Sequence, residues 1–184
     1  VTIINIMDKQ ILKQILRDTQ QEVVRYKVEP RELIIDDFPC CVLVGVRRSG
    51  KSYMLYQQIQ QLLINGKQWD EILYLNFEDE RLENFTAEDF NRLLECHQEM
   101  YGKRPMLFLD EIQNVAGFQR LVDSLYIKSN VDVYITGSNA YMLSGELATL
   151  LTGRYVEINL LPLQFSEYYD FMVLKSPNLS KNEI

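Results

Sequence analysis

The segment at residues 45–52 constrains this chain more than any other part of its sequence. It reads GVRRSGKS, follows a short apolar run at residues 40–44, and precedes a stretch with apolar side chains at helical spacing, Leu55, Ile59 and Leu62. Glycines at both ends allow a tight turn whose backbone N–H groups converge at the start of a helix, where anions bind. The pattern predicts a phosphate-binding loop between a buried strand and a helix.

Two side chains of this loop have the chemistry that a nucleotide requires. We expect the Lys51 ammonium to reach the β- and γ-phosphates and the Ser52 hydroxyl to ligate Mg²⁺. An accidental glycine-containing turn is the alternative, which the flanking strand and helix disfavour. The loop by itself predicts nucleotide binding and leaves catalysis open. The predicted nucleotide-contacting residues are Gly45, Arg47, Arg48, Ser49, Gly50, Lys51, Ser52, Tyr53 and Ser138.

A second apolar run, at residues 106–109, ends in Asp110 and Glu111. Open α/β sheets bind their ligands at the carboxyl ends of parallel strands, which is where these two carboxylates would lie. We expect Asp110 to hold Mg²⁺ opposite Ser52, directly or through its waters. Glu111 is expected to accept the proton of a water aimed at the γ-phosphate, or to orient that water. A solvent-facing acidic turn is the alternative, and the phosphate loop upstream disfavours it.

Two further polar groups follow predicted strands. The sequence TGSN at residues 136–139 ends a strand, and Asn139 there can hydrogen-bond the attacking water or the γ-phosphate, although Ser138 or Asn139 as a helix N-cap explains the same residues. The acidic residues 78–80 end another strand. They can orient Arg47 or Arg48, support waters on Mg²⁺, or form a solvated turn, and the sequence leaves these alternatives open.

Together these motifs resemble the Walker A, Walker B and sensor-1 elements of AAA-type P-loop ATPases. More narrowly, residues 45–164 resemble the AAA domain of a prokaryotic ATPase family in which an uncharacterised C-terminal domain follows. The matching motifs cover about two thirds of the chain and stand in the family order. They are GVRRSGKS at 45–52, NFEDE at 76–80, LDEIQ at 109–113, ITGSN at 135–139, ELATLLTGR at 146–154 and LLPLQFSEY at 160–168.

The resemblance implies ATP as the ligand, Mg²⁺ as the cofactor, and hydrolysis that moves other domains. It also implies that Arg154 is an arginine finger, since a Gly-Arg pair before the fifth strand serves a neighbouring subunit's γ-phosphate in such ATPases. A homo-oligomer through Arg154 follows from that role, and a guanidinium suits phosphate geometry. The alternative is a surface arginine at a helix end, where a cation is favourable.

Helical and strand patterns alternate along the chain. This alternation predicts an α/β fold with a parallel sheet and right-handed crossovers. By resemblance, the fold is of the P-loop NTPase type, with three αβα layers and the strand order 5-1-4-3-2. The predicted strands cover residues 40–44, 71–77, 105–109, 131–136 and 154–160, and the predicted helices after the first strand cover 51–64, 86–100, 117–128, 141–151 and 164–174.

The chain is expected to divide at about residue 36. Residues 1–36 form an N-terminal helix, from about residue 8 to residue 27, and a linker that packs on the core, while residues 37–184 form the ATPase core. The chain begins with Val1 and stops soon after the fifth predicted strand. We therefore expect the helical lid of AAA proteins, with its second sensor arginine, and the family's C-terminal domain to lie outside it.

Composition limits the partners. The 184 residues suit one compact domain, and 19 basic against 26 acidic residues give a net charge of -7, which does not support a domain-wide nucleic-acid surface but leaves a local basic patch open. Cys40, Cys41 and Cys96 form no metal-spaced set. No apolar run reaches membrane length and no signal peptide is evident, so we expect a cytoplasmic protein without a membrane partner.

Two other classes of function compete with an ATPase. One is a guanine-nucleotide switch or phosphoryl-transfer protein, against which the chain has no Asn-Lys-x-Asp motif. The other is a non-hydrolysing nucleotide-binding regulatory module that acts through protein or DNA contacts. Comparing ATP turnover with ATP affinity separates the second from an enzyme.

Overall fold

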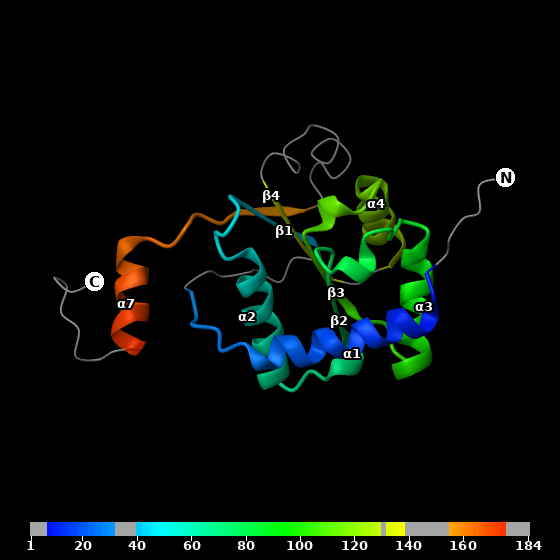
Figure 1. The fold of residues 1–184 in the computed structure, drawn as a ribbon, viewed down its shortest axis with the longest axis horizontal. Coiled ribbons are helices and arrows are strands. Elements are labelled where there is room, and N and C mark those ends of the chain that lie inside the picture. Colours follow the sequence, from blue (N-terminus) through cyan, green and yellow to red (C-terminus); the bar gives the residue numbers. More distant parts are fainter. Residues whose placement is uncertain (1–6, 32–39, 130–131, 139–154, 176–184) are drawn as a thin grey trace.

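The computed structural model describes residues 7–31, 40–129, 132–138 and 155–175. Helices and strands alternate along them, with three short 3₁₀ turns between (Figure 1). The helices are α1 (Lys9–Arg25), α2 (Lys51–Ile64), α3 (Asp89–Tyr101), α4 (Phe118–Ser129) and α7 (Phe165–Lys175). The strands are β1 (Cys40–Gly45), β2 (Ile72–Asn76), β3 (Met106–Asp110), β4 (Val133–Ser138) and β5 (Val156–Asn159), and the 3₁₀ turns are η1 (Trp69–Glu71), η2 (Glu80–Leu82) and η3 (Ile112–Asn114).

The five strands form one parallel sheet in the order β2-β3-β4-β1-β5. Read from the other edge this is 5-1-4-3-2, so the predicted strand order and the P-loop NTPase fold class are confirmed. The register pairs Gly45 with Ser138 and Asn76 with Asp110. The carboxyl ends of β1, β2, β3 and β4 therefore meet at one edge of the sheet.

The two faces of the sheet pack into separate apolar cores, because successive strand side chains point to opposite sides. Val42 and Val44 of β1 join the core that α3 and α4 cover, together with the first half of α1. Cys41 and Leu43 join the core that α2 covers. The predicted three-layer αβα arrangement follows from these two cores.

Helix α1 covers the outer edge of β2. It passes from α3 toward α2 alongside this strand (Figure 1). Midway along it, the Thr19 hydroxyl donates a hydrogen bond of 3.1 Å to the carbonyl of Tyr74. An edge strand presents unpaired backbone groups that invite pairing with another chain. Thr19 satisfies one of these groups, and the helix shields the edge.

Several element bounds differ from the sequence predictions. Helix α3 begins at Asp89 rather than at residue 86, because the Asp89 carboxylate accepts hydrogen bonds from the Thr86 N–H and hydroxyl at 3.0 and 2.9 Å. Strand β4 continues to Ser138 rather than ending at residue 136, so Ser138 lies in the strand instead of after it. The N-terminal helix ends at Arg25, two residues early, where Tyr26 turns extended. The predicted helix at 141–151 lies outside the described residues.

None of the helices in the described part of the chain is long and apolar enough to cross a membrane.

Candidate nucleotide-binding site

The loop that joins β1 to α2 has the backbone that its glycines predicted. Gly50 lies in the left-handed region with φ of 95° and immediately precedes the first residue of α2, and Arg48 is left-handed too, with φ of 66°. A Cβ atom at Gly45 would lie 2.5 Å from the Leu160 carbonyl oxygen and 2.6 Å from the Ser49 hydroxyl. Gly45 is therefore required by the close approach of the chain after β5 and of the Ser49 side chain.

Lys51 lies inside this loop. Its side chain is 3% exposed, and its ammonium donates hydrogen bonds of 3.3 Å to the carbonyl oxygens of Gly45 and Val46. The Glu111 carboxylate, which reaches over from the end of β3, lies 3.5 Å from the same ammonium. The structure therefore joins the two sequence motifs through a Lys51–Glu111 ion pair.

Asp110 is fully buried at the end of β3. Its carboxylate accepts hydrogen bonds from the hydroxyls of Tyr74 (2.9 Å), Thr136 and Ser52. Burial raises the pKa of Asp110, and the three hydroxyl donors act in the opposite direction because they favour the ionised form. Carboxylate and hydroxyl oxygens are the ligands that Mg²⁺ prefers, and the contact between Asp110 and Ser52 brings both kinds to one point. The residues present thus fit the predicted metal.

The backbone of Glu111 adopts a conformation that is rare for a residue with a side chain. Its φ is 53°, in the left-handed region. The Glu111 N–H donates a 2.9 Å hydrogen bond to the Thr136 hydroxyl, and the Gln113 amide donates to the Glu111 carboxylate. Strained backbone of this kind persists only where the surroundings hold it, and it clusters at functional sites. Here it directs Glu111 toward Lys51.

Lys51, Ser52 and Glu111 line one pocket of about 470 Å³. Its volume lies within the usual range for small-molecule sites. The pocket unites most of the predicted nucleotide-contacting residues with the candidate base, and the predicted acid Glu78 also lines it. The lining residues are Arg47, Arg48, Gly50, Lys51, Ser52, Tyr53, Glu78 and Glu111.

Comparison with known proteins places this site in a family. The profile of the AAA domain matches residues 37–169. The chain belongs to the AAA domain family. An uncharacterized protein of Haemophilus influenzae is 47% identical over 128 residues, which cover 69% of this chain and 32% of the relative. The uncharacterized protein MJ1544 of Methanocaldococcus jannaschii is 37% identical over 170 residues, covering 91% of the chain and 37% of the relative.

The chain therefore spans about one third of the length of these two curated relatives. Among solved structures, AMPPCP-bound DnaA from Aquifex aeolicus matches with a TM-score of 0.48 and 13% sequence identity, over 96% of this chain and 55% of DnaA. The family match and the sheet order identify the chain as an AAA-type P-loop nucleotide-binding core.

The other predicted site residues lie next to the pocket or outside the residues that the structure describes. Ser49 is buried. Its N–H donates a 3.1 Å hydrogen bond to the Val46 carbonyl and so stabilises the turn of the loop. Ser138 ends β4 beside Gly45. Asn139 and Arg154 lie outside the described residues.

The acidic residues 78–80 differ in what they contact: one pairs with an arginine of the loop, and the other two belong to a solvated turn. Glu78 lies 3.6 Å from Arg47, with both side chains exposed, so the pair contributes little to stability. Asp79 caps η2 and pairs with Arg81, which also reaches Asp18 of α1 at 2.6 Å. Glu80 is exposed. Only Glu78 therefore faces the pocket.

Sequence reasoning missed two residues that hold the Asp110 carboxylate. Thr136 stands in the TGSN motif, and pairing of its strand with β3 was the signal that could have found it. Tyr74 lies inside β2, two strand positions before Asn76, and its hydroxyl reaches Asp110 from the neighbouring strand. Only the strand order brings it there.

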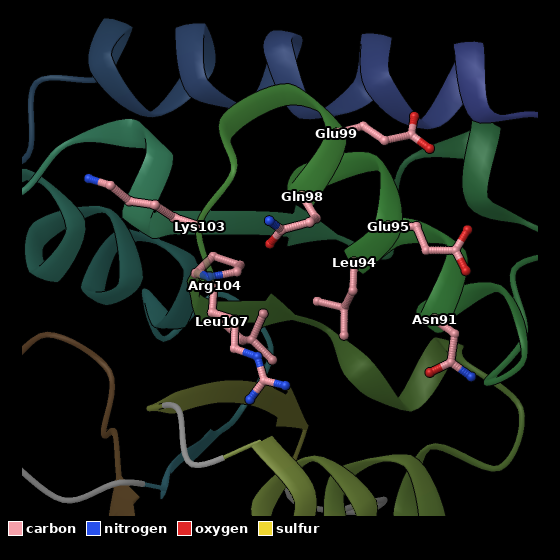
Figure 2. Close-up of a pocket in the computed structure, with 9 residues that line it drawn as sticks. Asn91, Leu94, Glu95, Gln98, Glu99, Lys103, Arg104 and Leu107 are labelled. Carbon is pink, nitrogen blue, oxygen red and sulfur yellow. The ribbon is translucent and has the colours of Figure 1, made fainter.

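A larger hollow of about 740 Å³ lies elsewhere on this AAA domain. Figure 2 shows Leu94 of α3 and Leu107 of β3 lining it, with Glu95 and Glu99 along the helix. Leu107 is near the amino end of β3, away from the carboxyl ends where such sheets bind ligands. Both glutamates form ion pairs with Lys9 of α1. The smaller pocket is therefore the candidate functional site.

Proposed function

We propose that this chain binds ATP with Mg²⁺ and hydrolyses it, and that hydrolysis moves other parts of a longer protein. The observation that carries the proposal is the contact of Lys51 with Glu111 across the pocket, beside the Ser52–Asp110 contact. An ammonium, a candidate base, a hydroxyl and a buried carboxylate thus meet at the loop between β1 and α2. Membership of the AAA domain family supports adenine as the base.

Phosphate binding is assigned to the loop and its lysine. The start of α2 favours anions, because its first N–H groups have no partner within the helix. Lys51 is buried and has Glu111 as its carboxylate partner, so a γ-phosphate would compete with Glu111 for the ammonium. That exchange would release the Glu111 carboxylate toward the reacting phosphate. Arg47, Arg48 and Tyr53 are exposed at the rim, where they would contact a bound nucleotide.

Asp110 and Ser52 would hold the metal. A bound Mg²⁺ would supply positive charge that neutralises the phosphates as the reaction proceeds. Tyr74 and Thr136 position the Asp110 carboxylate and, as hydrogen-bond donors, favour its ionised form. The Thr136 hydroxyl also accepts the Glu111 N–H. This one threonine therefore fixes the metal-binding carboxylate and the candidate base relative to each other.

Glu111 is assigned as the residue that accepts a proton from the attacking water. Asn139 would orient that water or the γ-phosphate. Arg154 would act as an arginine finger on a neighbouring subunit, which requires a homo-oligomer. The last two roles depend on family membership and on the sequence motifs alone.

The experiment that tests the proposal separates binding from turnover. Millimolar Mg-ATP should raise the melting temperature by about 5–10 °C, because a ligand at 100 times its Kd contributes about 2.7 kcal/mol. Lys51→Ala should lose most of this shift, whereas Lys67→Ala, at an exposed lysine just after the end of α2, should keep it. An unchanged melting curve of the parent in Mg-ATP would refute nucleotide binding.

Glu111→Gln should retain the melting shift and lose turnover by about 10²–10⁴-fold, the usual contribution of a general base. Glu80→Gln is the matched control at an exposed acid and should hydrolyse ATP like the parent. Turnover of Glu111→Gln at the parental rate would remove Glu111 from the mechanism. A parent that binds ATP and never hydrolyses it would instead favour the non-hydrolysing regulatory module.

The role of Arg154 has its own test in the protein of full length. Arg154→Ala should lower turnover by about 10³–10⁵-fold with a smaller effect on ATP affinity. Mixing it with Glu111→Gln should restore part of the turnover, since a mixed interface can pair an intact arginine with an intact base. No recovery in mixtures that demonstrably exchange subunits would exclude a finger acting between subunits.

A further inference from the structure

The guanidinium of Arg31 connects three segments that are far apart in the sequence. Its Nε and Nη2 donate to the two carboxylate oxygens of Glu167 in α7 at 3.0 and 3.2 Å. Nη1 donates to the carbonyl oxygen of Ser49 in the phosphate loop at 3.2 Å, and Nη2 also donates to the Leu161 carbonyl at 3.3 Å. The side chain is only 13% exposed. We call these four hydrogen bonds the Arg31 bridge.

Both ends of the bridge are themselves held in place. The backbone of Arg31 is fixed on α2 by Gln57, which accepts its N–H at 2.9 Å and donates to its carbonyl at 3.0 Å. Glu167 accepts the Gln164 N–H at 2.8 Å at the start of α7. The Arg31 guanidinium, and then this N–H, hold the pKa of Glu167 below its usual value. A charged fork on a fixed backbone is a geometrically specific contact.

The contact with Ser49 bears directly on the phosphate loop. In a planar trans peptide, the carbonyl of one residue and the N–H of the next point in opposite directions. By holding the Ser49 carbonyl, Arg31 therefore directs the Gly50 N–H away from itself. Gly50 lines the 470 Å³ pocket, whereas Arg31 lines a separate hollow of about 610 Å³ beside α7. The Ser49–Gly50 peptide thus separates the nucleotide pocket from the α7 contact.

In the part of the chain that the structure describes, α7 is not anchored by a buried apolar side chain. Among the side chains of residues 165–173 that the structure describes, none is buried, and Phe165 is 63% exposed. Figure 1 shows α7 beyond α2, at the end of the molecule farthest from α3. The polar bridge is accordingly the principal specific contact that fixes α7 beside the loop among the described residues.

We propose that Arg31 is a positioning residue of the phosphate loop that couples nucleotide binding to the docking of α7. The proposal rests on the proposed function, because it needs a nucleotide in the loop. The docked state has the Ser49–Gly50 peptide pre-oriented and therefore binds the nucleotide more tightly. By thermodynamic reciprocity, the nucleotide must then favour docking of α7 by the same factor.

The test uses the parent chain, two bridge variants and one control. Arg31→Lys keeps the positive charge but cannot span Ser49, Leu161 and both oxygens of Glu167. Glu167→Gln keeps the shape of the acid and removes its charge. Asp170→Asn is the matched control, because Asp170 is exposed, lies on the same helix and makes no contact with Arg31 in the bridge. Mg-ATP affinity and hydrogen exchange of the α7 amides are measured for each protein.

In the parent, Mg-ATP should slow exchange across α7. In Arg31→Lys, the Kd for Mg-ATP should rise by about fivefold or more, the lower end of usual couplings between sites, and α7 should no longer respond to the nucleotide. Glu167→Gln should exchange faster in α7 and should also lose the response. Asp170→Asn should match the parent in both measurements. Circular dichroism and melting of each variant verify that it is folded.

The outcomes separate the two proposals. A parent that binds no Mg-ATP would overturn the proposed function and, with it, the coupling. A parent that binds Mg-ATP while α7 exchange stays unchanged would overturn the coupling alone. The coupling would also be overturned if folded Arg31→Lys bound Mg-ATP with the Kd of the parent. The same conclusion would follow if Asp170→Asn lost the α7 response as fully as Glu167→Gln.

Discussion

Two helices, α1 and α7, are held against the rest of the described structure by different kinds of contact. Helix α1 buries four apolar side chains almost completely, Leu12, Ile15, Leu16 and Val23. Helix α7 buries none of its described side chains and makes its charged contact through Glu167. Both also form ion pairs, so the difference lies in apolar burial alone.

This difference sets how easily each helix can move. Full burial of an aliphatic side chain contributes about 1.5–3 kcal/mol, so release of α1 would cost several such contributions. A partly exposed ion pair contributes about 0–1 kcal/mol. Coupling between sites usually amounts to about 1–3 kcal/mol, which is enough to shift α7 and too little to release α1. We infer that α1 is a permanent part of the fold and that α7 can respond to a ligand.

The largest effect should come from a cavity under α1. Ile15→Ala should lower the free energy of unfolding by about 2–5 kcal/mol, because Ile15 is fully buried between α1 and the sheet. Phe165→Ala in α7 is the matched truncation and should stay within about 0.5 kcal/mol of the parent. Urea unfolding measures the free energy of unfolding of both variants, and its dependence on urea concentration should stay unchanged. Equal losses for the two variants would contradict the contrast between the helices.

A smaller loss is expected where α1 covers the edge of β2. Thr19→Val removes the hydroxyl and leaves the buried Tyr74 carbonyl without this donor, which should cost about 1–3 kcal/mol. Thr19→Ser keeps the hydroxyl and should recover most of the stability. The same unfolding measurement applies. If Val and Ser at this position are equally stable, the hydrogen bond to the strand edge contributes nothing.

The sequence predicted elements better than it predicted contacts. The spacing of apolar residues located α2 and the strands, because the periodicity within a single segment is enough to indicate a helix or a strand. The loop motif separately placed Lys51 at the pocket. Asp110 and Glu111 were assigned correctly to the end of a strand. The roles of Gly45 were seen only in part, since its contact with the Leu160 carbonyl depends on a segment more than a hundred residues away.

Arg31 shows why the remainder could not be predicted. It lies in a stretch without helical or strand periodicity, and its partner Glu167 is 136 positions away. A basic residue has many acidic residues available in a chain with 26 of them, so charge alone selects no partner. The same holds for Tyr74, which has the spacing of a core residue and carries a hydroxyl that only the neighbouring strand explains.

The smallest expected effect is an acid-induced release of α7 without unfolding. The pKa of Glu167 is lowered from its ordinary value of 4.5 by Arg31 and by the Gln164 N–H. A carboxyl whose pKa is lower in the folded state stabilises that state fully above the unfolded pKa and loses this effect as the pH falls through the folded pKa. Below pH 4.5, protonation of Glu167 should therefore weaken the bridge, whereas Arg31 stays charged.

Helix α1 should stay docked over part of the same range. Its contact with α3 uses Glu99, whose pKa is lowered to about 2 by Lys13 and Lys9, and its apolar side chains do not titrate. Amide NMR signals followed from pH 7 to pH 3 should show α7 shifting before α1, with a change in global stability of no more than about 1 kcal/mol from this pair. In Glu167→Gln the α7 signals should already lie near their acid positions at pH 7. An α7 transition that persists in Glu167→Gln, or that accompanies the loss of α1, would mean that this carboxylate does not control docking.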